Sequence, residues 1–161
     1  MNGGLTIRPA IPADAGLVMD FIKALASYEK LGHEVDATER DVAAALFAPQ
    51  PRVFCDIAAW DGAPAGFALW FYNFSTFRGR HGIYLEDLFV LPSLRGKGIG
   101  KALLLHLAQR AVREGCGRVE WSVLDWNKPS IDFYLSLGAV PMNEWTVFRL
   151  TDDALMRAGR P

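Results

Sequence analysis

Hydrophobic and polar residues follow two periodicities along the chain, and each periodicity predicts a different kind of secondary structure. Apolar residues recur at helical spacing between residues 17 and 25 and again between 99 and 114, which predicts amphipathic helices lying on a sheet. Shorter apolar runs bounded by Gly, Pro and Asp predict strands. The expected strands are 5–8, 53–60, 67–73, 82–90 and 118–124, and a further short helix is expected at 128–137.

Start and stop signals support these elements. Asp14 is expected to serve the first-turn N–H groups of the first helix, and Thr38 with Asp41 outlines a capping box for the second. The run 61–64 predicts the turn of a hairpin, and 115–117 is expected to end the helix that begins near residue 99.

The order of these elements indicates the fold class. Strands come first in hairpins and then alternate with helices, which favours an α/β chain with a mixed sheet and helices on both faces. Residues 139–140 and 146–150 are expected to close the sheet as a final strand pair. With 161 residues and no repeat, linker or low-complexity tract, the chain is expected to form one domain over residues 1–161.

Composition narrows the classes of function. A formal net charge of −1 gives no basic field for nucleic acid. The N-terminus does not resemble a signal peptide and no apolar run approaches the roughly 20 residues of a membrane helix, so a cytoplasmic location without a membrane partner is expected. Cys55 and Cys116 are too few for a disulfide framework or a zinc site, and the three histidines lack ligand spacing, so no metal is expected.

Residues 88–100 carry the most specific signal, because an apolar strand, a proline turn and a glycine-rich loop directly precede an apolar helix. Gly96, Gly98 and Gly100 remove Cβ atoms, so several backbone N–H groups can converge on one anion at the positive end of the helix. Arg95 adds a charge at the rim. The pattern predicts a pyrophosphate-binding loop.

Two other kinds of glycine loop also bind phosphates. A Walker loop would need Gly in place of Arg95 and Ser or Thr in place of Ala102. The dinucleotide fingerprint would need Gly or Ala in place of Lys101, although Glu120 lies where a ribose-binding carboxylate is expected. Dinucleotide binding stays an alternative at this stage.

The pattern Arg-x-x-Gly-x-Gly at Arg95, Gly98 and Gly100 resembles the acyl-CoA loop of the GNAT N-acetyltransferases. Segments 7–10, 84–90 and 126–134 resemble the diamine (spermidine/spermine N1-) acetyltransferase branch. The resemblance implies a GNAT fold, with a mixed, mostly antiparallel sheet of six or seven strands and a splayed strand pair at the acyl-CoA site. It also implies acetyl-CoA as co-substrate and a homodimer.

The resemblance assigns roles to individual residues. A backbone N–H near Leu88 would polarise the thioester carbonyl. Glu86 is the expected general base, acting through a water, and Tyr134 the expected acid that protonates the leaving thiolate. The residues expected to bind CoA are Leu88, Phe89, Val90, Arg95, Gly96, Lys97, Gly98, Ile99, Gly100, Lys101, Asn127, Ser130 and Tyr134.

Glu29, Glu86 and Asp87 match family positions at an amine-binding groove, and Trp145 offers an aromatic wall to a cation. This predicts acetyl transfer to a primary amine of a small diamine, polyamine or lysine-like ω-amino acid. The run 30–34 is less acidic than in polyamine enzymes, so a thialysine-type acceptor is an alternative.

Two further alternatives concern mechanism and class. Neither cysteine has an activating neighbour in the sequence, which favours direct transfer in a ternary complex over a covalent acetyl-enzyme. A non-catalytic acyl-CoA-binding module is the alternative outside the enzymes. The presence of both Glu86 and Tyr134 argues against it, because a binding module needs neither a base nor an acid.

Overall fold

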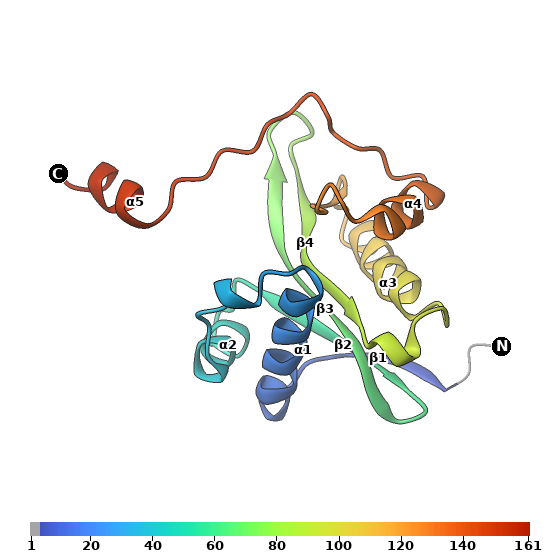
Figure 1. Ribbon diagram of the computed structural model, residues 1–161. Coiled ribbons are helices and arrows are strands. Elements are labelled where there is room, and N and C mark those ends of the chain that lie inside the picture. The colour runs from blue at the N-terminus through green and yellow to red at the C-terminus, as the bar shows by residue number, and fades with distance from the viewer. Residues whose placement is uncertain (1–3) are drawn as a thin grey trace. The chain divides into compact units, whose positions relative to one another are not determined.

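The computed structural model describes residues 4–161 (Figure 1). The chain forms two compact units, the first ending at Ser122 and the second running from Val123 to Pro161. The first unit contains the sheet and three α-helices, and the second contains α4 (Lys128–Ser136) and α5 (Asp152–Ala158).

A five-stranded sheet in the order β1-β2-β3-β4-β5 forms the centre of the first unit. Its strands are β1 (Leu5–Pro9), β2 (Phe54–Trp60), β3 (Ala63–Ser75), β4 (Arg80–Val90) and β5 (Val119–Trp121). The first four strands pair antiparallel and β5 pairs parallel with β4. The expected mixed, mostly antiparallel sheet is confirmed, with five strands in place of six or seven.

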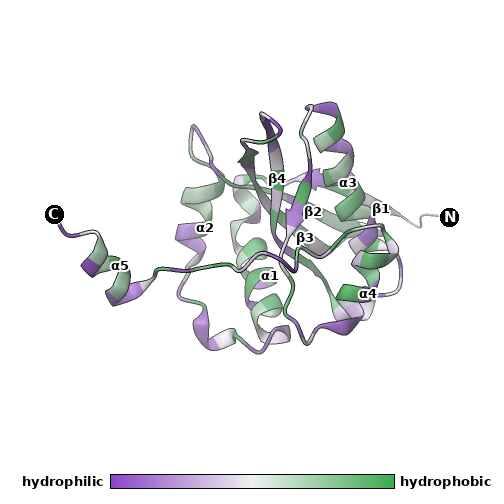
Figure 2. Ribbon diagram, turned by 90° about the horizontal axis from the view of Figure 1, so that it is seen from above, coloured by the Kyte–Doolittle hydropathy of each residue, from purple (hydrophilic) through white to green (hydrophobic). Residues whose placement is uncertain are grey.

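Helices cover both faces of this sheet, as predicted. α1 (Ala15–Tyr28) and α2 (Glu39–Leu46) lie on one face and α3 (Ile99–Arg113) lies on the other (Figure 1). Hydrophobic residues are prominent on α1 and α3, on either side of the strands (Figure 2). The apolar sides of the amphipathic helices therefore pack against the sheet and form one core on each of its faces.

The core under α1 is built around aromatic rings. The Phe21 ring of α1 stacks on the Phe67 ring of β3 with centroids 5.3 Å apart, and lies 6.3 Å from the Phe89 ring of β4. Phe67 has no exposed surface. On the other face, Leu103 and Leu107 of α3 are also fully buried. These contacts fix the position of β4 between two packed layers.

A β-bulge interrupts β4. Leu69 of β3 lies opposite Asp87, but the next residue, Trp70, lies opposite Leu85. Glu86 is therefore the extra residue on β4. Because side chains alternate along a strand, Asp87 shares the face of Leu69, which packs in the α1 core, whereas Leu85 shares the face of Trp70, whose ring lies 5.1 Å from the guanidinium of an α3 arginine.

The strand pair β4–β5 separates immediately before this bulge. β5 pairs only with Ile83–Leu85 of β4, and no strand of the described chain pairs with this side of β4 beyond Leu85. The Leu91 N–H donates to the Ala65 carbonyl, so the antiparallel alternation directs the N–H and C=O groups of Leu88 and Val90 away from β3. These backbone groups form an open edge, and the expected splay is confirmed.

The hairpin between β2 and β3 differs slightly from the prediction. Its turn contains only Asp61 and Gly62, with φ angles of 49° and 83°, and pairing resumes at once with Trp60 opposite Ala63. Positive φ at both positions matches the twist of a two-residue hairpin. The second strand therefore begins at Ala63, four residues before its predicted start.

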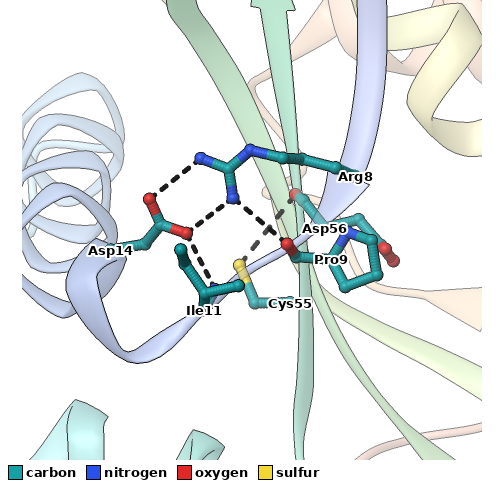
Figure 3. Close-up of polar contacts among 6 residues, drawn as sticks. All are labelled: Arg8, Pro9, Ile11, Asp14, Cys55 and Asp56. Carbon is teal, nitrogen blue, oxygen red and sulfur yellow. Dashed lines mark hydrogen bonds and ion pairs between the residues drawn. The ribbon is translucent and has the colours of Figure 1, made fainter.

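Asp14 does not serve the first turn of α1 as expected. Its carboxylate accepts from the Ile11 N–H at 2.8 Å and from the Arg8 guanidinium at 2.7 and 3.0 Å (Figure 3). The bidentate pair ties the end of β1 to the start of α1 and holds the pKa of Asp14 below its usual value, with the Arg8 hydrogen bond as the largest cause. The predicted capping box of Thr38 and Asp41 is confirmed.

The final strand pair predicted at 139–140 and 146–150 does not form. Gly138 ends α4 with a φ of 85°, and the Trp145 N–H donates to the Met142 carbonyl in a turn. Pro141 has no N–H for a ladder, and no strand is described between Val123 and Pro161 to act as a partner. Residues 139–150 therefore join no sheet, and α5 follows them.

The aromatic core generates a stability prediction. Phe67→Ala should lower the free energy of unfolding by about 3–5 kcal/mol, because it removes a fully buried ring and leaves a cavity under α1. The matched control is Phe77→Ala, since the Phe77 side chain is 99% exposed. Urea unfolding measures both; equal losses from the two variants would contradict this description of the core.

Candidate functional site

The glycine loop joins β4 to α3 through a short 3₁₀ turn, Pro92–Leu94 (Figure 1). Gly96 and Gly98 have φ angles of 81° and 80°, a left-handed conformation that favours glycine, and Gly98 is the N-cap of α3. Because Gly98 has no side chain, the N-cap offers no oxygen to the first-turn N–H groups of the helix. The loop therefore has the features of an anion site, with free main-chain donors at the positive end of a helix of 15 residues.

Two cations flank the loop. The Arg95 guanidinium lies 4.7 Å from the centre of the Tyr28 ring and 5.5 Å from that of Phe89, and its Nε donates to the Val90 carbonyl at 3.2 Å. The Lys97 ammonium lies 5.2 Å from the centre of the Trp60 ring. Aromatic rings thus hold both cations beside the loop, where they can meet the charge of a diphosphate.

The other predicted CoA contacts in this unit differ in accessibility. The Leu88 and Val90 backbone groups lie on the open edge. Phe89 and Ile99 are buried, with 4% and 1% of their surface exposed, and the Phe89 backbone faces β3. Ile99 can therefore contact a ligand only through main-chain atoms, whereas the side chain of Phe89 is buried and its backbone N–H and C=O groups are directed to β3. The Gly100 Cα stands close to Val90, since a Cβ there would lie 3.7 Å from the Val90 Cγ2.

Three carboxylates gather beside the open edge, and we call Glu29, Glu86 and Asp87 the acidic trio. Glu29 is the C-cap of α1, Glu86 is the exposed bulge residue of β4, and Asp87 is half-buried on the α1 face. Burial raises the pKa of Asp87 to about 7, with further contributions from the charges of Glu86 and Glu29. Burial also raises the pKa of Glu29. The predicted amine-binding carboxylates of this unit are therefore electrostatically coupled.

The remaining predicted site residues lie in the second unit. Asn127 is the N-cap of α4, where its side-chain oxygen accepts from the Ser130 N–H at 3.4 Å. Tyr134 lies in the second turn of this helix, with its ring centre 5.4 Å from that of Phe133. Trp145 lies outside the helices and strands. Asn127, Ser130 and Tyr134 are thus joined by one short helix, and their roles stay predictions.

The cysteines lack the properties of nucleophiles. Cys55 is buried, and burial followed by the charge of Asp56 raises the pKa of its thiol to about 12. Burial and the charge of Glu114 also raise the pKa of Cys116. Since the thiolate is the reactive form, neither thiol is activated near neutral pH.

The carboxylate suggested for a dinucleotide ribose has other partners. Glu120 accepts from the Arg118 Nε at 2.8 Å and from the Asn73 Nδ2 at 3.0 Å. Within residues 4–161 no group of three or more His, Cys, Asp and Glu side chains is placed to hold a metal ion. None of the helices in that range is both long enough and apolar enough to cross a membrane.

Two features of the site were not predicted from the sequence. The bulge at Glu86 left one signal, since two adjacent acidic residues interrupt a strand that is otherwise apolar from Ile83 to Val90. The contact of Arg95 with Tyr28 left no such signal, because it joins residues far apart in the chain.

The raised pKa of Asp87 predicts a stability effect that depends on pH. Between pH 3.8 and about 7 the folded protein holds a proton on Asp87 that the unfolded chain has lost, so this group costs stability progressively as pH rises through that window. Asp87→Asn removes the buried charge and should raise Tm at pH 8 by roughly 5 °C, with a much smaller rise at pH 4. Calorimetry at both pH values measures this.

The matched control for that measurement is Asp20→Asn, because Asp20 is an exposed carboxylate of α1 outside the trio. It should change Tm by less than about 1 °C at either pH. A rise in Tm for Asp87→Asn that is equal at pH 4 and pH 8 would show that ionisation of Asp87 does not destabilise the fold.

Comparison with known proteins agrees with this geometry. Thialysine N-epsilon-acetyltransferase of Mus musculus is 37% identical over 166 residues, covering 96% of this chain and 97% of its own. Spermidine/spermine N(1)-acetyltransferase-like protein 1 of Homo sapiens is 29% identical, covering 93% of this chain and 23% of its own. The solved structure of an integron cassette protein from the mobile metagenome of V. cholerae superposes with a TM-score of 0.80 at 30% identity, covering 98% of both chains.

Residues 19–139 match the Acetyltransferase (GNAT) family, a range that includes the open edge, the glycine loop and α4. The expected fold and class of enzyme are thus confirmed, and the non-enzymatic alternative is not supported. The chain belongs to the GNAT family of acetyltransferases, in its spermidine/spermine acetyltransferase-like branch.

Proposed function

We infer that this enzyme transfers the acetyl group of acetyl-CoA directly to a primary amine of a small diamine, polyamine or lysine-like ω-amino acid. The observation that carries the proposal is the open edge of β4. The glycine loop follows the end of this edge, and the acidic trio lies beside it. An acyl donor and a cationic acceptor each have complementary groups on this short stretch of strand.

Main-chain groups that no neighbouring strand pairs with support the donor side of the proposal. The Leu88 and Val90 edge can accept the amide-bearing arm of CoA as an added strand, which satisfies backbone groups that β5 leaves open. At the end of the strand, the N–H groups of residues 95–101 and the positive end of α3 suit the diphosphate. Lys97 and Lys101 supply charge, and Asn127 and Ser130 are proposed as further contacts, as the resemblance implies.

The transfer requires three changes at the reacting atoms. A carboxylate of the acidic trio takes a proton from the ammonium, and the amine nitrogen attacks the thioester carbon. The Leu88 N–H stabilises the charge that develops on the carbonyl oxygen. The resemblance implies that the phenol of Tyr134 gives its proton to the thiolate when the carbon–sulfur bond breaks, and that it regains a proton lost by the nitrogen. Glu86 stays the base predicted from the resemblance.

A covalent acetyl-cysteine is a poorer mechanism for this chain. The pKa values of Cys55 and Cys116 are both raised, that of Cys55 to about 12, so neither supplies a thiolate at neutral pH. Direct transfer needs no such group.

For the acceptor, the relatives indicate two chemistries. One is named for thialysine and another for spermidine and spermine, and both substrates carry an amine on a flexible chain with a further cationic group. The acidic trio suits that second charge, and Trp145 is proposed as an aromatic wall. The higher identity and fuller coverage of the thialysine relative favour a lysine-like ω-amino acid.

We also propose that the chain works as one domain, as a homodimer and in the cytoplasm. The family resemblance supports these three statements. Light scattering tests the assembly, and a monomer at micromolar concentration would contradict the dimer.

Activity tests the proposal directly. The purified protein should release free thiol from acetyl-CoA when thialysine, lysine, spermidine or a short diamine is added, and Tyr134→Phe should lower kcat without changing the affinity for acetyl-CoA. Turnover is followed by thiol titration and mass spectrometry of the acetylated amine. Absence of turnover with every amine would refute the proposed function.

The glycine loop predicts a matched pair of variants. Gly98→Ala forces an L-residue into a φ of 80° at the N-cap of α3 and should raise the Kd for acetyl-CoA by about 10-fold. Gly115→Ala places the same strain, at a φ of 72°, beyond the other end of that helix, and it should leave the Kd unchanged. Isothermal calorimetry with acetyl-CoA measures both Kd values. Equal effects of the two variants would show that the glycine loop does not bind the cofactor.

A further inference from the structure

The bulge of β4 gives its two adjacent carboxylates different surroundings. Glu86 is the extra residue and its side chain is exposed, whereas Asp87 pairs with Leu69 and turns toward the half-buried α1 face. Without the bulge, Asp87 would share the face of Leu85. The inserted residue therefore places a carboxylate on the α1 face of the strand, one residue before the proposed carbonyl-binding N–H of Leu88.

The titratable groups around Asp87 come from four elements. Glu86 is on its own strand, Glu29 ends α1, and Cys55 of β2 lies across the sheet on the same face. The Arg95 guanidinium lies over the neighbouring Phe89 ring and is engaged with Tyr28 and the Val90 carbonyl. Burial, followed by the charges of Glu86 and Glu29, raises the pKa of Asp87 to about 7.

We propose that Asp87, on the α1 face of the bulge, accepts the proton of the attacking amine, while Glu86 and Glu29 hold the cationic acceptor. The inference rests on the proposed function and names the base within it. One N–H bond of the ammonium breaks as an O–H bond forms on Asp87, the nitrogen bonds to the acetyl carbon, and the carbon–sulfur bond breaks. The thiolate takes the proton of Tyr134, the acid that the resemblance implies, and the second proton lost by the nitrogen restores the phenol. Asp87 then returns its proton to solvent.

Asp87 suits this role by its position and by its pKa, since the bulge sets it on the half-buried α1 face, whereas Glu86 is the exposed extra residue. A base works best when its pKa is near the working pH, since it is then deprotonated often enough to act and basic enough to take a proton. Asp87 meets this condition at about 7. A second cationic group held by Glu86 and Glu29 neutralises the two charges that help to raise the pKa of Asp87. Acceptor binding therefore also increases the fraction of ionised Asp87.

The test is the dependence of kcat and of kcat/KM on pH for the full-length enzyme, with thialysine and with spermidine. In the wild type, kcat/KM should fall with acidity below about pH 7 for both amines, because this acid limb of the profile reports the free enzyme. The acid limb of kcat should lie at lower pH, because the bound acceptor neutralises Glu86 and Glu29. Asp87→Asn should lower kcat by about 100-fold and abolish the limb. Glu86→Gln removes one charge from beside Asp87 and should keep the limb but move it to lower pH.

Asp20→Asn is the control outside the trio and should retain the wild-type profile. A limb that persists in Asp87→Asn, or that is abolished by Glu86→Gln alone, would overturn the inference and restore Glu86 as the base. If Asp87→Asn raises only KM, Asp87 binds the cation and is not the proton acceptor. If Asp87→Asn does not fold, a limb unmoved by Glu86→Gln would refute the coupling. Wild type that turns over no amine would refute the proposed function itself.

Discussion

One extra residue in β4 governs the candidate site. Before Glu86 the strand is paired on both sides and its side chains keep a regular alternation; after it, β5 has separated and only β3 remains as a neighbour. The insertion lets Leu88 and Val90 keep the α3 face while Asp87 turns to the α1 face. Donor and acceptor functions can therefore be assigned to the two faces of the same short segment.

An open edge and a half-buried carboxylate both carry a free-energy cost, which the rest of the unit must offset. Unpaired N–H and C=O groups at an edge invite pairing with other chains, and here the exposed row is short and lies next to a bulge. The cost of ionising Asp87 falls on a strand already fixed by the rings of Phe67 and Phe89 on one face and by Leu103 and Leu107 beyond the other. Strain at a functional site persists because packed layers on both sides leave the strand no alternative position.

Local chemistry made much of this predictable from sequence. The glycine loop could be recognised because positive φ angles and a helix start need particular residues at particular spacing, and the Thr38–Asp41 box likewise depends only on neighbours. The segment 139–150 failed, because a strand exists only if another strand accepts its backbone, and a one-dimensional pattern carries no such information. The partner of Asp14 was missed for the same reason: Arg8 competes for its carboxylate from the neighbouring strand.

Arg95 shows why the two sides of the site are best considered together. It was predicted from the loop motif as a charge for the diphosphate, yet its guanidinium is stacked on Tyr28 at the end of α1, next to Glu29, and it donates to the Val90 carbonyl on the open edge. This side chain thus satisfies one of the edge groups that a bound CoA arm would contact. Arg95 therefore joins the open edge to the end of α1, which carries part of the acidic trio, so neither side of the site is built independently of the other.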